Sequence, residues 1–392
     1  MRKFLSIAAI ALLGATSANA KVQCGGSFSS FVNSMKQEAV RKGHDQSTVD
    51  AFFASVRQDS ATIKADRAQG IFQKTFIDFS RALISQNRMT NGRANLRKWD
   101  SVFDVMESRY GVSRGVLTAF WAFETDFGAV QGNFNTLNSL VTLSHDCRRP
   151  DLFQPQVFSA LELYEQGNFS PTNTKGAWAG EIGMVQMLPG DIIAHGVDGD
   201  GDGKISLKTS PADALLSGAN VLSSLGWRAN EPWLQEVTLP ANLDWSKTGL
   251  NQSMKVSQWA RLGVAARTGN LGPSGLKASI LLPQGRKGPA FIAYPNFHVY
   301  FEWNKSFVYV TTAAYFATRL EGAPAYNAGN PDPALSPSQM QALQTKLNAR
   351  GHDVGGVDGI LGAKTRAAVQ AEQIRLGLPA DAWPTRELLN AL

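Results

Sequence analysis

The chain has very little cysteine, no long apolar run beyond its first residues, and no concentration of charge of one sign. Only two of its 392 residues are cysteines, and 43% are hydrophobic. This balance excludes a disulfide-rich scaffold and a disordered chain. No stretch of about 18 apolar residues is present, so a membrane-spanning helix is excluded. The formal net charge is +6 without a stripe of lysine and arginine, so nucleic-acid binding is not expected.

Residues 1–20 have the pattern of a secretory signal peptide. A basic start is followed by an apolar run from Phe4 to Leu13, and small residues lead to a cleavage site after Ala20. We therefore expect an exported, periplasmic protein. The small residues that precede a lipid-anchored cysteine are missing before Cys24, so no membrane anchor is expected.

The two cysteines, Cys24 and Cys147, both lie in the exported part of the chain. In an oxidising compartment such an even pair is a candidate disulfide. The alternative is two separate buried thiols. A bond would tie the mature N-terminus to a segment near residue 147.

A segment rich in proline and glycine divides the chain at residues 323–336. These residues recur too often there for a helix or a strand. The exported chain is also longer than a single hydrophobic core usually organises. The sequence thus predicts a larger domain at 21–322 and a small domain at 337–392.

Apolar residues in the larger domain repeat at spacings of three and four, which predicts a mainly α (α+β) fold. The clearest helical patterns are at residues 28–42, 47–56, 112–127 and 213–225. Alternation typical of strands is limited to patches such as 291–294, so any sheet is expected to be small. The small domain has three predicted helices, at residues 338–350, 365–376 and 384–392.

One acidic residue, Glu124, interrupts the apolar face of a predicted helix. Ser113 is expected to cap this helix, Leu117 and Phe120 lie on its apolar face, and Gly128 is expected to supply a left-handed C-cap. A carboxyl group that faces the core is costly to ionise, so its pKa rises. That property suits a general acid, although a structural ion pair would also explain a buried glutamate.

The segment Glu124–Gly128 resembles the E-T-x-[WF]-G signature of lytic murein transglycosylases of the membrane-bound type B family. Further landmarks follow in the order that this family shows. They are residues 140–144, Arg148-Arg149, 176–189, an acidic loop at Asp198, Gly226-Trp227, Pro232-Trp233 and residues 303–306. Together these landmarks span most of residues 24–322.

The resemblance implies a lysozyme-like helical catalytic domain in which a single glutamate carries out both proton transfers. Glu124 would protonate the oxygen between N-acetylmuramic acid and N-acetylglucosamine, and then remove the proton from the muramyl carbon-6 hydroxyl. The product is a 1,6-anhydro end, and no water or catalytic cofactor is needed. We expect no second catalytic carboxylate near Glu124, since Asp126 lies on another face of the helix.

The resemblance also assigns side chains to the glycan groove. These are Gln186, Trp303, Asn304, Ser306 and Tyr309. Two positions depart from the family: Trp303 stands where tyrosine is usual, and Ala177 stands where many members have serine. Both departures remove hydroxyl groups that would bind substrate or Glu124. Without the resemblance, Gln186 and Asn304 are better read as buried amides that satisfy backbone turns.

The segment from Asp198 to Ile205 repeats the first eight positions of an EF-hand loop. The expected ligands of a structural calcium ion are Asp198, Asp200, Asp202, the carbonyl of Lys204 and a closing carboxylate from Asp213. Asp213 is included because Thr209 occupies the position of the usual closing glutamate. The alternative is a plain cluster of aspartate and glycine turns.

The small domain resembles peptidoglycan-binding type 1 domains through Asp358, Gly359, Gly362 and Thr365. This resemblance implies that residues 337–392 hold the enzyme on its polymeric substrate. The alternative is a dimerisation appendage, although we expect a monomer.

The function implied is that of a periplasmic lytic transglycosylase. Its expected partners are peptidoglycan glycan strands and, in addition, other cell-wall enzymes. Two alternatives stay open: a hydrolytic muramidase that uses Glu124, and a non-catalytic wall-binding scaffold.

Overall fold

The computed structural model describes residues 21–68 and 74–392. The predicted signal peptide lies outside these residues. In the part described, no helix is both long and apolar enough to span a bilayer. Helices dominate the chain and the strands are short, which confirms the mainly helical fold class.

The helices of the larger domain begin with α1 (Phe28–Arg41), α2 (Gln46–Phe53), α3 (Ser60–Arg67), α4 (Phe76–Leu83), α5 (Gln86–Lys98), α6 (Asp100–Tyr110) and α7 (Arg114–Thr125). They continue with α8 (Thr136–His145), α9 (Pro150–Glu165), α10 (Pro189–His195), α11 (Pro211–Ser224), α12 (Val256–Arg261), α13 (Pro295–Trp303) and α14 (Phe307–Leu320). The small domain contains α15 (Pro337–Ala349), α16 (Ala363–Arg375) and α17 (Arg386–Ala391), as its sequence predicted.

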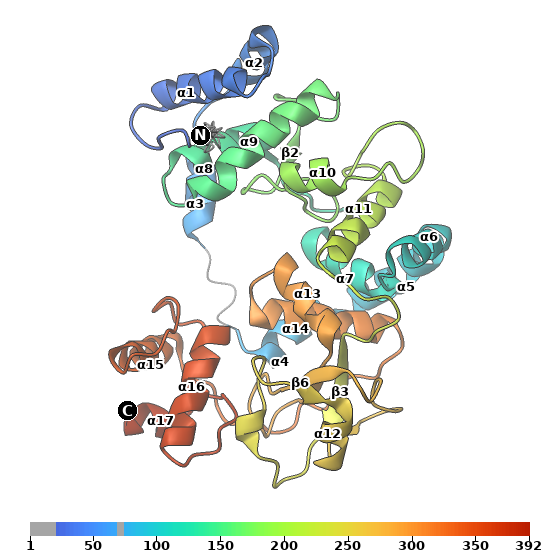
Figure 1. Ribbon diagram of the computed structural model, residues 1–392, viewed down its shortest axis with the longest axis vertical. Coiled ribbons are helices and arrows are strands. Elements are labelled where there is room, and N and C mark those ends of the chain that lie inside the picture. The colour runs from blue at the N-terminus through green and yellow to red at the C-terminus, as the bar shows by residue number, and fades with distance from the viewer. Residues whose placement is uncertain (1–20, 69–73) are drawn as a thin grey trace, which may run out of the picture.

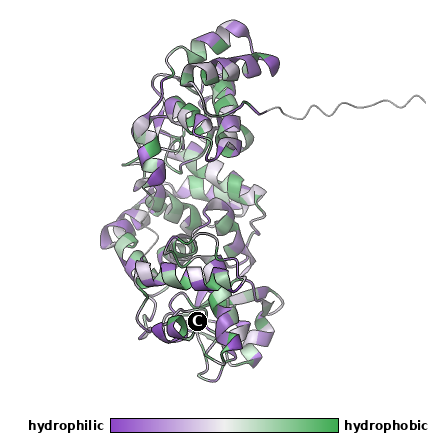
Figure 2. Cartoon of the chain, turned by 90° about the vertical axis from the view of Figure 1, so that its left-hand side faces the viewer, coloured by the Kyte–Doolittle hydropathy of each residue, from purple (hydrophilic) through white to green (hydrophobic). Residues whose placement is uncertain are grey.

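Helices α7 and α14 lie in the middle of the elongated molecule, with α1, α2, α8 and α9 toward one end (Figure 1). The ring of Phe123 on α7 stacks on Phe316 of α14, with 5.1 Å between their centroids. Leu117 and Phe120 of α7 are fully buried, as the apolar spacing predicted. Full burial of such a side chain contributes about 1.5–3 kcal/mol. Hydrophilic and hydrophobic residues mix along most helices, as expected for helices with one buried face (Figure 2).

A small antiparallel sheet lies at the opposite end from α1 and α2 (Figure 1). Its strand order is β4 (Met254–Lys255), β6 (Lys277–Leu281), β7 (Phe291–Ala293), β3 (Leu234–Thr238) and β5 (Ala265–Ala266). Two further short strands, β1 (Phe134–Asn135) and β2 (Lys175–Gly176), pair near the helical end. The five-stranded sheet has a separate apolar core around the fully buried Trp259. Strand β7 coincides with the predicted strand patch at 291–294.

Cys24 and Cys147 form a disulfide with 5.3 Å between their Cα atoms. The bond joins the start of the described chain to the turn between α8 and α9. In the chain-entropy account, a crosslink that closes so long a loop stabilises a fold by roughly 4–5 kcal/mol.

The segment predicted as a linker has no regular structure, but it is packed against the larger domain. The Tyr326 hydroxyl hydrogen-bonds Ser80 at 2.9 Å, and its ring lies 5.4 Å from that of Phe76. The amide of Asn327 donates to Glu236 at 2.7 Å. The segment therefore fixes the small domain in place.

The small domain docks through a buried arginine. The guanidinium of Arg366 lies over the ring of Phe307 at 4.5 Å and donates to the carbonyl oxygen of Pro283 at 2.6 Å. Burial lowers the pKa of Arg366 to about 9. Nearby, Arg286 of the larger domain pairs with Asp381 of the small domain at 3.2 Å.

We expect Arg366→Glu to release the small domain, because the new carboxylate would face carbonyl oxygens and Asp381 without a cation. Small-angle scattering should show a larger radius of gyration, and proteases should cleave within residues 323–336. Lys364→Glu is the control, since Lys364 lies on the same helix but is exposed in its pair with Asp353. Unchanged scattering from Arg366→Glu would contradict docking through this residue.

Candidate active site

Helix α7 carries Glu124 in its last turn and is fixed at its first turn by a second glutamate. Glu321 accepts hydrogen bonds from the Ser113 hydroxyl and from the amide of Gly115. Ser113 is the N-cap residue, but its side chain makes no capping bond, so the predicted serine cap is wrong. The carboxylate of Glu321 satisfies the helix terminus in its place, and its negative charge also suits the helix dipole.

The helix ends earlier than predicted. Thr125 is its last residue, and Asp126 and Phe127 already adopt left-handed backbone conformations with φ of 51° and 61°. The predicted cap at Gly128 is therefore wrong. The reason is tertiary: the Thr125 hydroxyl donates to the carbonyl of Met184 at 2.6 Å, and Asp126 pairs with Arg88 at 3.1 Å.

The carboxyl group of Glu124 is bound by two side chains that come from other helices. The hydroxyl of Tyr309, on α14, donates to Oε1 at 2.5 Å. The indole N–H of Trp303, at the end of α13, donates to the same oxygen at 3.2 Å. Trp303 also stacks on Phe120, with 4.5 Å between ring centroids. The expected loss of a hydrogen bond at Trp303 is thus wrong, because the indole supplies one.

Glu124 opens into a cavity of about 490 Å³. Its walls come from α7, α10, α11, α13 and the loop between β2 and α10. The polar and aromatic side chains that line it are Glu124, Trp178, Glu181, Gln186, Asp191, His195, Glu302, Trp303 and Asn304. A cavity with an acid at its wall and two indole rings is suited to bind a sugar.

Burial raises the pKa of Glu124 above its usual range, and the charge of Glu181 raises it further. Hydrogen bonds from Tyr309 and Trp303 oppose this rise, because they stabilise the ionised form. Burial thus favours the protonated carboxyl group, while the two donors stabilise the anion left after the proton departs. That combination is what general acid catalysis requires.

A second carboxyl group, Glu181, lines the same cavity. A carboxyl group near Glu124 is therefore present, although the prediction that Glu124 is the only catalytic carboxylate is not tested by this geometry. The helix pattern of α7 held no information on it, because Glu181 comes from a loop 57 residues further on, as the two residue numbers show. The sequence signal for Glu181 was that it is the only charged residue in the segment Ala177–Pro189.

The remaining residues assigned to the glycan groove divide into two groups. Gln186 and Asn304 line the cavity. Each also binds backbone: Gln186 donates to the carbonyl of Gly183 at 2.8 Å, and Asn304 accepts from the amide of Ser306 at 2.8 Å. Ser306 does not line this cavity, since its hydroxyl caps α14 by accepting from Tyr309. The position observed for Ser306 is thus that of a helix cap.

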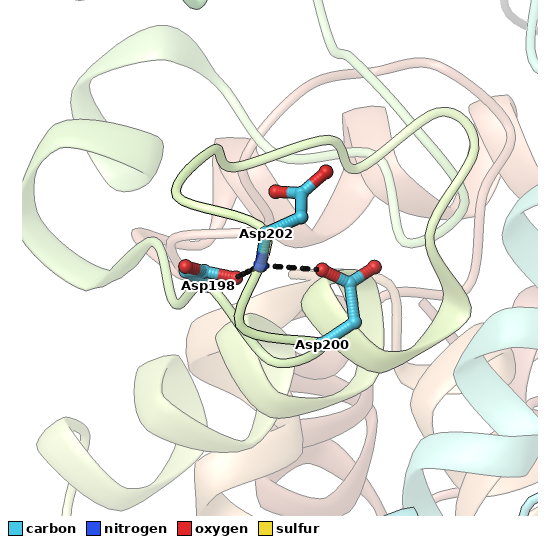
Figure 3. Close-up of side chains that lie close together, drawn as sticks. All are labelled: Asp198, Asp200 and Asp202. Atoms are coloured by element: carbon cyan, nitrogen blue, oxygen red, sulfur yellow. Dashed lines mark hydrogen bonds between the residues drawn. The ribbon is translucent and has the colours of Figure 1, made fainter.

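Three aspartates of the acidic loop gather their oxygens within 4.8 Å of one another. Asp198 accepts from the amides of Gly201 and Gly203, at 2.7 and 2.8 Å. The amide of Asp202 donates to both Asp198 and Asp200 (Figure 3). This arrangement of hard oxygen donors fits a calcium ion.

Asp213 lies outside that group of three. It is fully buried, and its two carboxylate oxygens accept from the amides of Gly199 and Ser206, at 2.9 and 2.6 Å. Its predicted role as the closing ligand is not supported by this geometry. Asp213 instead ties both ends of the loop to the first turn of α11. Lys204, whose carbonyl was the other predicted ligand, donates its amide to Asp202 at 2.8 Å.

The sequence as a whole matches known families over both domains. Residues 27–318 match the transglycosylase SLT domain family. The chain belongs to this family. Residues 336–392 match a peptidoglycan binding domain family, in agreement with the resemblance of the small domain.

Individual relatives agree with this assignment. The membrane-bound lytic murein transglycosylase B of Escherichia coli (strain K12) is 26% identical over 234 residues, which are 59% of this chain and 63% of that protein. The chain thus spans less than two thirds of that relative. The crystal structure of SltB3 from Pseudomonas aeruginosa in complex with NAG-anhNAM-pentapeptide is 37% identical, with a TM-score of 0.85 over 94% of this chain and 99% of SltB3.

A more distant structure shares the fold. The Escherichia coli lytic transglycosylase Slt35, solved in complex with calcium, has 24% identity and a TM-score of 0.65 over 76% of this chain and 96% of its own. The lysozyme-like, mainly helical fold expected for the larger domain is thus confirmed. In sequence and fold, the chain is thus similar to lytic transglycosylases.

We expect Tyr309→Phe to slow peptidoglycan cleavage at least roughly tenfold, since a hydrogen bond to a charged group contributes about 1.5–3 kcal/mol. The lost bond stabilised ionised Glu124, so its removal raises the pKa of Glu124 further. The protonated acid then persists to higher pH, and the basic limb of the kcat/KM profile should move upward. Tyr110→Phe is the control, because the buried Tyr110 hydroxyl has no hydrogen-bond partner among the described residues. An unmoved basic limb would contradict the role of Tyr309.

Proposed function

We propose that the protein cleaves the β-1,4 bond between N-acetylmuramic acid and N-acetylglucosamine and leaves 1,6-anhydromuramyl ends. The observation that carries this proposal is the environment of Glu124, whose carboxyl group faces a cavity and receives both of its hydrogen bonds on one oxygen. Because Oε1 accepts from Tyr309 and Trp303, the proton of the neutral acid belongs on Oε2. That oxygen is free to meet a glycosidic oxygen in the cavity.

The two proton transfers then use the same carboxyl group. Glu124 first donates its proton to the departing sugar oxygen, while positive charge develops at the muramyl anomeric carbon. The resulting anion is stabilised by Tyr309 and Trp303. As a base, it removes the proton from the carbon-6 hydroxyl, whose oxygen attacks the anomeric carbon and closes the ring. No water enters the products.

Glu181 bears on the hydrolytic alternative, because a muramidase needs an ionised base to activate water while Glu124 is still protonated. Burial raises the pKa of Glu181, as it does that of Glu124. Burial likewise raises the pKa of Asp191, the next carboxyl group along the cavity. Because Glu181 resists ionisation as Glu124 does, it is a poor base for activating water. This favours intramolecular attack by the carbon-6 hydroxyl. The presence of Glu124 and of its two hydrogen-bond donors also argues against a non-catalytic scaffold.

The two-domain organisation supports a site of action at the cell wall. The peptidoglycan binding domain would hold the enzyme on the polymer and raise the local concentration of cleavable bonds. Such a substrate and the export pattern in residues 1–20 support the periplasm as the site of the proposed activity.

The central test is the mass of the products released from purified peptidoglycan. Intramolecular attack leaves ends about 18 mass units lighter than the reducing ends made by hydrolysis, because no water is added. Glu124→Gln should reduce the rate more than about a hundredfold, since it removes the general acid. Reducing muramyl ends would establish the muramidase instead.

The melting temperature of the same variant tests whether burial raises the pKa of Glu124. A group with a raised pKa in the folded state loses its contribution as pH rises through that pKa. Glutamine cannot ionise, so Glu124→Gln should melt at an equal or higher temperature than the wild type at pH 8, and the gain should vanish near pH 4. A lower melting temperature at both pH values would mean that the variant is misfolded.

We also propose that the acidic loop holds a structural calcium ion through Asp198, Asp200 and Asp202. The spacing of these aspartates and the gathering of their oxygens support this proposal. The loop precedes α11, which packs against α10 and α7 at the cavity, so the ion would stabilise one wall of the site. It would take no part in the chemistry.

Calcium should raise the melting temperature of metal-free protein, by an amount equivalent to about 2.7 kcal/mol at 100 times the dissociation constant. The double variant Asp200→Asn with Asp202→Asn should abolish the shift, because asparagine retains an acceptor oxygen but removes the charge. Magnesium at the same concentration is the control, since its octahedral preference fits the loop poorly. Equal melting temperatures with and without calcium would identify the loop as a turn cluster.

A further inference from the structure

Glu181 has a buried oxygen without a hydrogen-bond partner, next to the catalytic acid. Its carboxyl group lines the cavity that holds Glu124. Oε2 of Glu181 is buried and makes no hydrogen bond within the described residues. A buried polar atom normally has a hydrogen-bond partner, so a buried oxygen without one is energetically unfavourable in a residue with a purely structural role. A group bound in the cavity can supply that partner.

The loop holds the backbone of Glu181 firmly beside the cavity. The amide of Ala177 donates to the carbonyl of Glu181 at 3.0 Å. Directly after it, the backbones of Ile182 and Met187 exchange two hydrogen bonds of 2.8 and 3.0 Å. On the other side, a Cβ atom on Gly176 would come within 1.9 Å of the carbonyl of Glu181. The backbone that directs this side chain is therefore closely packed.

No direct cation contact neutralises Glu181 in the described part of the chain. Arg149 is near enough for its charge to act on Glu181, but its guanidinium is hydrogen-bonded to Asp66 and lies over the ring of Phe153. The other ionisable groups on the cavity wall are Glu124, Asp191, His195 and Glu302. Glu302 already pairs with Lys305 at 2.8 Å. Glu181 thus has no ion pair among the described residues, and only backbone amides, those of Ala179 and Glu181, stabilise its ionised form.

We propose that Glu181 is a substrate-contacting residue whose free Oε2 hydrogen-bonds a hydroxyl or amide N–H group of the sugar bound beside Glu124. A carboxyl group in this position serves either as acceptor or, when protonated, as donor. The N-acetylated sugars of a glycan strand present both kinds of group. This inference rests on the proposed function, since it takes the cavity to be the glycan site.

The test compares Glu181→Ala and Glu181→Gln in the full mature chain, with purified peptidoglycan as substrate. We expect Glu181→Ala to lower kcat/KM roughly tenfold to a hundredfold, as for the loss of a hydrogen bond to a charged or buried group. Glutamine retains an acceptor and a donor, so Glu181→Gln should lose less. Both variants should melt at or above the temperature of the wild type. Glu231→Gln is the control, because Oε2 of Glu231 is also buried without a hydrogen bond among the described residues, although it pairs with Arg228 at 3.5 Å, and Glu231 lies outside the cavity.

A binding measurement separates contact with the sugar from an effect on Glu124. Chitotetraose, the tetramer of N-acetylglucosamine, is titrated by calorimetry into Glu124→Gln and into Glu124→Gln with Glu181→Ala. The second protein should bind at least about fivefold more weakly if a hydrogen bond to the sugar is lost.

The outcomes distinguish this inference from the function beneath it. If Glu124→Gln abolishes cleavage but Glu181→Ala changes neither kcat/KM nor chitotetraose affinity, the role of Glu181 is refuted and the proposed function stands. If Glu181→Ala slows cleavage, leaves affinity unchanged and moves the basic limb to lower pH, Glu181 acts only through Glu124, and contact with the sugar is refuted. If Glu124→Gln cleaves normally, the proposed function itself fails.

Discussion

The architecture of this transglycosylase depends on keeping one carboxyl group away from water while giving its anion two donors. Ionising an isolated buried carboxyl is very costly, so a helix face that consists of apolar residues and one glutamate retains the proton. The packing of α7 on α14 provides this burial, and it also places Tyr309 beside Glu124. Trp303 completes the arrangement, because its ring covers Phe120 while its N–H reaches the carboxyl group. Burial and anion stabilisation thus come from the same contacts.

Two carboxyl groups, those of Glu124 and Glu181, line the cavity, and their different surroundings suit them to different roles. Both have raised pKa values, for the same reason of burial. Only Glu124 receives side-chain hydrogen bonds that stabilise its ionised form, so it is the group that can release a proton and take it back. Glu181 lacks those donors, and a role in holding substrate fits it better than a role in proton transfer.

The peptidoglycan binding domain is physically connected to the helix that supports the catalytic acid. Arg366 of α16 lies over Phe307, the first residue of α14, and Tyr309 follows within the same turn. The irregular segment between the domains is held by Tyr326 and by Asn327. These contacts hold the binding domain at a defined position relative to the cavity. A flexible linker without such contacts would let the domain move freely. A polymer bound to both domains must match that fixed geometry.

The sequence by itself determined the elements and the acid. The spacing of apolar residues located α1, α7, α11 and the three helices of the small domain to within a few residues, because each helix buries one face whatever it packs against. The same spacing placed Glu124 on a buried face, and the order of motifs pointed to the family. Helix ends were less predictable, since the cap of α7 depends on Glu321 and its last turn on Met184, both distant in the chain.

Only the tertiary structure decided what surrounds the acid. Tyr309 and Trp303 were named as groove residues, but their hydrogen bonds to the same oxygen of Glu124 follow from how α13 and α14 cross α7. Glu181 enters the cavity through a loop with no periodic pattern, and Asp213 is turned inward to bind two backbone amides of the acidic loop. Local spacing specifies which face of a helix is buried. It does not specify which distant side chains share the buried space, because that depends on long-range packing.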